Sequence, residues 1–138
     1  MTKKIFKSNI LVAAAVLIFG IACVMAILYQ HFGKQINTEL KKEATYLVYG
    51  VEENGIDYLK QIKEKDDRIT YIAEDGTVLY DSRRDADILK NHGNRKEVRE
   101  ALSKGEGADV RKSETVGKDM YYYALLLNDG TVLRVSKS

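Results

Sequence analysis

The sequence lacks proline and tryptophan altogether, and its 138 residues include a single cysteine, Cys23. One cysteine cannot form an intramolecular disulfide, and it excludes a CxxC redox or zinc site. Strong charge of either sign is also missing, because 22 basic and 20 acidic residues give a formal net charge of only +2. Without a basic stripe, nucleic acid is not expected as a partner.

Catalytic signatures are absent too. The sequence contains no G-x-S-x-G, H-E-x-x-H or phosphate-binding-loop motif, so we expect this chain to be no enzyme and to carry no cofactor. Its length leaves room for one compact domain and an anchor.

The longest apolar run covers residues 10–29, which are twenty residues without a charge. At about 1.5 Å per residue a helix of this length crosses roughly 30 Å of hydrocarbon, so the run predicts a transmembrane helix. A cleaved signal peptide is the alternative, because lysines precede the run. Its apolar region would normally be only about 7–15 residues long, which disfavours cleavage. We therefore expect residues 1–9 to be a cytoplasmic tail and the chain from about residue 30 to lie outside the cytoplasm.

Beyond the membrane the apolar residues first repeat at helical spacing. The pattern predicts a membrane-proximal helical segment over residues 30–65, interrupted at Asn54-Gly55 and restarted with Asp57 as a cap. The apolar stripe has two readings, packing against the domain's own sheet and pairing with a second copy, and both stay open.

Residues 66–138 instead show the alternation and turn chemistry of strands. Asp-Gly turns predict a hairpin near residues 68–80 and a second one near residues 120–133, with an edge strand over 107–116. Between the hairpins, Asn94 is expected to cap a helix over 95–104, with Glu97 completing a capping box. The fold class is therefore α+β, with a long helix followed by a five-stranded antiparallel sheet and a short helix.

Few residues offer chemistry. His92 lies beside acidic residues on one loop, and we favour a structural role in which it and Asn91 hydrogen-bond that loop. The tyrosines of residues 121–123 alternate across a strand, so the outer two share a face. They are either packing residues or, together with a few other side chains, the wall of a pocket for a small anion. The candidate ligand-binding residues are Tyr71, Arg95, Tyr121, Tyr123 and Arg134. No metal ligands are predicted.

The amino-acid sequence resembles that of the extracytoplasmic PAS-like (Cache, or PDC) domain of phosphate-regulon-type sensor histidine kinases. The residues that carry the resemblance are the stretches 68–82, 91–98, 117–124 and 130–136. The resemblance implies a homodimeric two-component receptor in the cell membrane, which signals by helix movement in response to a small anion or a protein partner.

This sequence ends at Ser138, before any second span or kinase core, so the resemblance implies a fragment truncated ahead of its second transmembrane helix. Its proline count of zero also excludes the usual phosphoacceptor motif, in which a proline closely follows the histidine. A pilin-like or other membrane-anchored structural protein is the alternative. Such a protein should carry a glycine just before the apolar run and an acidic residue early within it, and neither is present.

Overall fold

The computed structural model describes residues 2–62, 67–112 and 117–138. The chain divides into two compact units, Met1–Gln35 and Ile36–Ser138, which are described separately. One helix, α1 (Thr2–Asn54), contributes to both.

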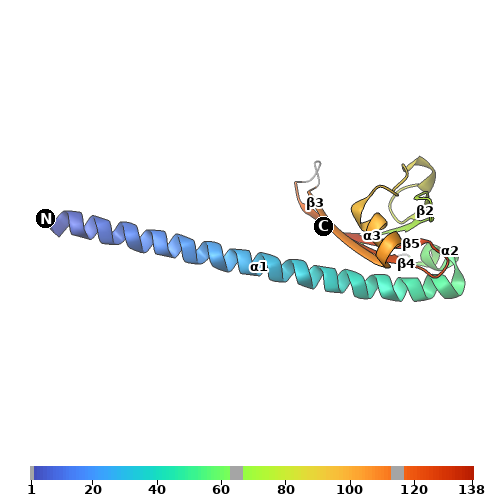
Figure 1. Cartoon of the computed structure of the whole chain (residues 1–138), viewed down its shortest axis with the longest axis horizontal. Coiled ribbons are helices and arrows are strands. Elements are labelled where there is room, and N and C mark those ends of the chain that lie inside the picture. Colours follow the sequence, from blue (N-terminus) through green and yellow to red (C-terminus); the bar gives the residue numbers. More distant parts are fainter. Residues whose placement is uncertain (1, 63–66, 113–116) are drawn as a thin grey trace. The chain divides into compact units, whose positions relative to one another are not determined.

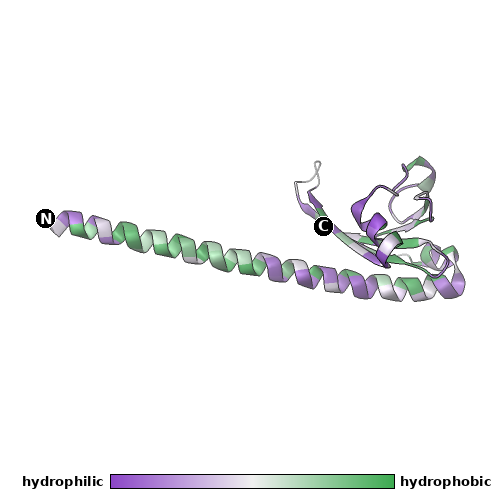
Figure 2. Ribbon diagram, in the orientation of Figure 1, coloured by the Kyte–Doolittle hydropathy of each residue, from purple (hydrophilic) through white to green (hydrophobic). Residues whose placement is uncertain are grey.

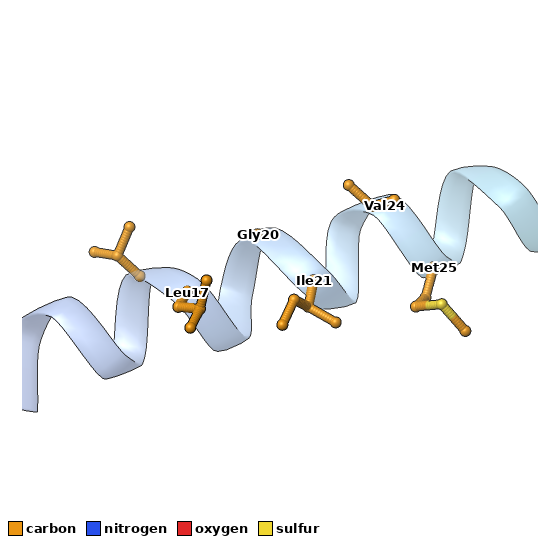
Figure 3. A pocket seen from close by; sticks show the side chains of 6 residues that line it. Leu17, Gly20, Ile21, Val24 and Met25 are labelled. Atoms are coloured by element: carbon orange, nitrogen blue, oxygen red, sulfur yellow. The ribbon is translucent and has the colours of Figure 1, made fainter.

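The first unit consists of the N-terminal part of α1. This helix is long and apolar enough to cross a membrane, and Figure 2 shows an apolar stretch of it between a hydrophilic start and the polar residues that follow. A shallow groove of about 450 Å³ surrounds Gly20, with Leu17, Ile21, Val24 and Met25 projecting beside it (Figure 3). Its lining is apolar and comes from this single helix, which suits contact with lipid chains.

The second unit is built on one antiparallel sheet with strand order β2-β1-β5-β4-β3. The predicted α+β series of long helix, two strands, short helix and three strands is confirmed (Figure 1). Its elements after α1 are α2 (Ile56–Gln61), β1 (Arg68–Ile72), β2 (Val78–Asp81), the 3₁₀ turn η1 (Ala86–Ile88), α3 (Lys96–Lys104), β3 (Glu106–Lys112), β4 (Asp119–Leu126) and β5 (Val132–Lys137).

Alternation along the strands places apolar residues on both faces of the sheet, and helices pack on both. On one face the end of α1 and α2 form the larger core, in which Leu40 and Leu47 of α1 pack with Leu133 and Val135 of β5. On the other face α3 packs through Val98 and Ala101 against β1, β4 and β5, forming a smaller core. Strands β4 and β5 therefore carry apolar residues on both sides, with Tyr123 and Leu133 in the larger core and Ala124 and Val132 in the smaller one.

The helix starts differ from the predictions. The N-cap of α3 is Arg95 rather than Asn94, and no side chain caps the helix. The expected capping role of Glu97 is also wrong, because its side chain turns inward and is fully buried. Likewise α2 starts after Gly55, with Asp57 in its first turn and no side-chain cap. The predicted edge strand is described as far as Lys112, and its residues 113–116 lie outside the described part of the chain.

Both hairpins turn through the predicted Asp-Gly pair. Gly76 and Gly130 adopt φ of 91° and 88°, and in each turn the aspartate side chain accepts a hydrogen bond from the threonine N–H two residues later, at 2.9 and 3.0 Å. Gly76 has a second constraint, since the loop before α3 lies against it. A Cβ there would approach the backbone nitrogen of Gly93 to 2.6 Å, whereas at Gly130 it would meet only the flexible end of Glu74, at 3.1 Å.

We therefore expect Gly76→Ala to lower the free energy of unfolding by about 2 kcal/mol, because positive φ and backbone overlap act together. Gly130→Ala is the matched control, with the same turn and nearly the same φ but a yielding neighbour, and it should cost about half as much. Urea denaturation of the two variants compares them. Equal losses would show that the close approach of the loop at Gly76 carries no cost.

Candidate functional site

The strand register collects polar side chains on the α3 face of the sheet. One row across the sheet consists of Asp81 on β2, Thr70 on β1 and Arg134 on β5, which pair in sequence. The next row places Arg68 opposite Ser136, which in turn pairs with Tyr122 of β4. Side chains alternate between the two faces along a strand, so residues two apart on one strand, together with their paired residues on neighbouring strands, lie on the same face. These two rows therefore form one polar surface beside α3.

A continuous hydrogen-bonded network joins the first row to α3. Arg134 donates to Glu97 Oε1 from Nη1 at 3.1 Å and to Thr70 Oγ1 from Nη2 at 3.2 Å. Thr70 donates to Asp81 at 2.9 Å, and Arg68 Nε donates to both oxygens of the same carboxylate. Thr70, Glu97 and Arg134 are at most 3% exposed, so charges that would be costly in isolation are buried together.

Glu97 also anchors a second arginine. Arg111 of β3 binds the two carboxylate oxygens through its two terminal nitrogens, at 2.6 and 2.8 Å, and contacts Asp109 at 2.9 Å. Such a fork-to-carboxylate pair is the strongest form of this interaction. Burial opposes ionisation of Glu97, but the hydrogen bonds and charge of Arg111 outweigh it, so the pKa of Glu97 lies below its usual value.

Tyr122 supplies an aromatic floor for these arginines. The guanidinium carbon of Arg111 lies 3.8 Å from the centre of the Tyr122 ring, and that of Arg134 lies 5.0 Å from it. Stacking of this kind holds the planar groups in fixed orientations at little cost in hydration.

Above this surface lies a pocket of about 220 Å³, rich in positive charge. Its lining consists of Arg68, Arg84, Leu89, His92, Arg95, Arg111, Tyr122 and Arg134, without a carboxylate among the described residues. Two buried nitrogens in this lining, Nε of Arg134 and Nδ1 of His92, have no hydrogen-bond partner in the described structure. An unpartnered buried polar atom carries a desolvation cost that a ligand could remove.

Burial of His92 beside Arg134 and Arg95 lowers the pKa of its imidazole. The backbone of His92 ties its loop to the first hairpin, since its N–H donates to Gly76 O at 2.9 Å, while Asn91 donates to Asp75 O at 2.9 Å. The expected hydrogen bonding of this loop is thus observed for Asn91 and for the main chain of His92.

This lowered pKa gives the fold a pH dependence. The unfolded chain takes up a proton near the ordinary histidine pKa of about 6.5, whereas folded His92 resists protonation, so stability is present above that value and lost as the pH falls. We expect the free energy of unfolding to decline between about pH 7 and about pH 5, and the decline to be reduced in His92→Gln. Denaturation across this range checks it, with His31→Gln as the exposed control. An unchanged slope in His92→Gln would contradict the prediction.

The structure brings together two of the five predicted ligand-binding residues. Arg95 and Arg134 line the pocket. The three tyrosines lie on the opposite face, in or beside the core under α1: Tyr71, Tyr121 and Tyr123. As predicted, the outer pair of the Tyr121–Tyr123 run shares a face and Tyr122 takes the other, and it is Tyr122 that reaches the pocket.

Those three tyrosines contact the core side of the domain instead. Tyr71 shares a 2.9 Å hydrogen bond with Thr131, and Tyr123 donates to Glu106, which also pairs with Lys41 of α1 at 3.3 Å. Burial, followed by the hydrogen bond to Glu106, raises the pKa of Tyr123. Tyr123 therefore connects the sheet to α1 rather than to the pocket.

Sequence reasoning missed Arg68, Arg84, Arg111, Tyr122 and the central Glu97. A signal existed for Arg111 and Tyr122, because the two-residue period of β3 and β4 assigns each to a face. Nothing local identified Glu97, whose partners lie 14 and 37 residues further along the chain. Within the described ranges, no three His, Cys, Asp or Glu residues gather where they could hold a metal ion.

A family model described as Single Cache-like matches residues 30–133, which is most of the chain and extends from α1 to the start of β5. The chain belongs to the Single Cache-like family. The described sheet domain is accordingly a Cache-type sensory domain rather than a catalytic one. The pocket of about 220 Å³ described above, called the arginine pocket from here on, lies between the sheet and the segment that precedes α3. Family membership favours the receptor interpretation over the pilin-like alternative.

Solved structures with related folds include the extracellular domain of a proposed histidine kinase, rpHK1S-Z16, at 16% identity and a TM-score of 0.44, covering 62% of this chain and 36% of that one. The Bacillus subtilis YkuI protein, which has an EAL domain, is 15% identical with a TM-score of 0.42, and the match covers 78% of this chain and 34% of that one. A Cache chemosensory domain that recognises carboxylic acids is 13% identical with a TM-score of 0.47, and the match covers 80% of this chain and 95% of that one. The chain thus spans about a third of the first two proteins. Among curated proteins none matches it.

Proposed function

We propose that this chain is the extracytoplasmic input module of a membrane receptor, and that its Cache-type domain senses a small anion in the arginine pocket. The observation that carries the proposal is the pocket itself, where five arginines converge and two buried nitrogens have no partner among the described residues. Among the described residues their paired carboxylates are Asp81, Glu97 and Asp109, which leaves two positive charges in excess within that part of the chain. A volume of about 220 Å³ suits a small organic acid or an inorganic oxyanion.

The receptor we propose is a homodimer held in the cell membrane by residues 10–29, with its N-terminus in the cytoplasm and a histidine kinase as its output. Support for the anchor comes from the unbroken apolar run of α1. Support for signalling comes from the continuity of α1, because the helix that enters the sensory unit is the same helix that carries the apolar run. A ligand that favours one arrangement of the domain would bias α1 and so the output.

Binding of probe anions to the full chain in detergent micelles tests the pocket. We expect calorimetric titration with sulfate, phosphate or succinate to show saturable binding at fixed ionic strength. Arg95→Gln should weaken binding by about tenfold, since it removes one exposed cation from the lining without disturbing a buried pair.

Arg99→Gln is the matched control. Arg99 is also exposed and lies on α3 one turn beyond Arg95, but it is not part of the lining, so its loss should leave the affinity unchanged. If none of the three anions binds the unmodified chain, or if Arg95→Gln and Arg99→Gln weaken binding equally, the pocket is not an anion site.

A further inference from the structure

A carboxylate of the protein already lies among the arginines of the pocket. Glu97 is 0% exposed and reaches inward from α3, where its two oxygens make three hydrogen bonds to Arg111 and Arg134. Both arginines also line the pocket. The guanidinium groups of Arg111 and Arg134 are held in place by the Tyr122 ring and by Glu97. They therefore face the pocket and at the same time bind the carboxylate of Glu97.

The position of Glu97 is held by the backbone as well as by charge. Helix α3 rests directly on β3 at Gly107, where an added Cβ would approach the Cβ of Glu100 to 2.7 Å and would overlap the carbonyl oxygen of Glu97. This close approach keeps the Glu97 side chain over the sheet. Any anion that enters the pocket therefore meets a fixed negative charge which already neutralises part of its arginine wall.

From this geometry we infer that Glu97 is an internal competitor that determines specificity in the pocket, an inference that rests on the proposed anion-sensing function. An incoming anion has to draw Arg111 and Arg134 partly away from Glu97. Repulsion by the Glu97 carboxylate weakens the binding of every anion. A doubly charged anion is attracted strongly enough by the remaining arginines to overcome this repulsion, whereas a singly charged anion is not. Occupation of the pocket also loosens the contact that joins α3 to β3 and β5.

Removing the charge of Glu97 while keeping its shape tests the inference. In the full chain in micelles, Glu97→Gln should bind sulfate about tenfold more tightly than the unmodified protein, and acetate should become a measurable ligand. Glu100→Gln is the matched control, because Glu100 lies on the same helix, pairs with Lys96 at 3.8 Å and does not line the pocket. It should bind sulfate as the unmodified chain does, as should Glu97→Asp, which retains the charge.

The outcomes separate this inference from the proposed function. If the unmodified chain, Glu100→Gln and Glu97→Gln all fail to bind sulfate, the proposed anion site itself is wrong. If the unmodified chain binds sulfate and Glu97→Gln binds it equally or less tightly, only the competitor role is overturned.

Loss of folding in Glu97→Gln is tested by circular dichroism during sulfate titration. The competitor role predicts that sulfate restores the fold at concentrations below those that saturate the unmodified chain. A variant that stays unfolded throughout that titration would make Glu97 a structural counter-ion and would overturn the inference.

Discussion

Replacing Glu97 with leucine is expected to lower the free energy of unfolding by about 3 kcal/mol in an anion-poor buffer. The substitution leaves Arg134, which is 3% exposed, without its only carboxylate partner in the described structure. Arg111 is less affected, since its side chain is 30% exposed and keeps Asp109. The loss therefore arises chiefly from one buried cation that has lost its counter-charge.

A second substitution identifies that cause. Adding Arg134→Met to Glu97→Leu removes both charges of the buried pair, so the double variant should regain much of the lost stability. Urea unfolding followed through the near-ultraviolet dichroism of the nine tyrosines provides the measurement, because the chain has no tryptophan. Glu97→Leu and the double variant would have equal stabilities if the loss came from packing rather than from the unpaired charge.

The order of elements could be predicted from the sequence because its signals are local. Each hairpin is specified by an Asp-Gly pair in which the aspartate bonds a backbone N–H two residues away and the glycine supplies the positive φ. The end of α3 was predictable in the same way, since Gly105 adopts the left-handed conformation with φ of 95°. Helix starts were less predictable, because polar residues such as Asn94 and Asp57 can cap a helix without being used.

The site could be predicted only in part because its contacts are not local. Strand alternation established that Tyr121 and Tyr123 share a face, but the period of two does not say which face lies under α1. Glu97 in the first turn of a helix has the sequence appearance of a capping-box residue, and only the register of β3 and β5 brings two arginines to it. Arg134 was a candidate ligand-binding residue, but its place between Leu133 and Val135 in the sequence left open whether it faces a pocket or solvent.

Strand β5 connects the pocket with the helix that leaves the domain. Arg134 faces the pocket, while its neighbours Leu133 and Val135 face the core formed with α1. A shift of β5 on ligand binding would therefore change the packing of the α1 residues that contact it. The apolar contact of α1 with the sheet is the step on which transmission in the proposed receptor depends.

Leu47→Ala tests that contact and is expected to lower the free energy of unfolding by about 3 kcal/mol. Leu47 is 1% exposed and packs in the core shared by α1, β4 and β5, so truncation leaves a cavity between helix and sheet. Tyr46→Ala is the matched control one residue away, because Tyr46 is 74% exposed and its loss should change stability by less than about 0.5 kcal/mol.

The same variant separates binding from transmission. The pocket lies on the opposite face of the sheet from Leu47. The folded Leu47→Ala domain should therefore bind sulfate with unchanged affinity, even though the packing of α1 against the sheet is weaker. Hydrogen exchange in the full chain should then show faster exchange at residues 40–51 and little change along α3. A drop in sulfate affinity matching the drop in stability would instead mean that the two faces of the sheet respond as one unit, and that α1 helps to form the pocket.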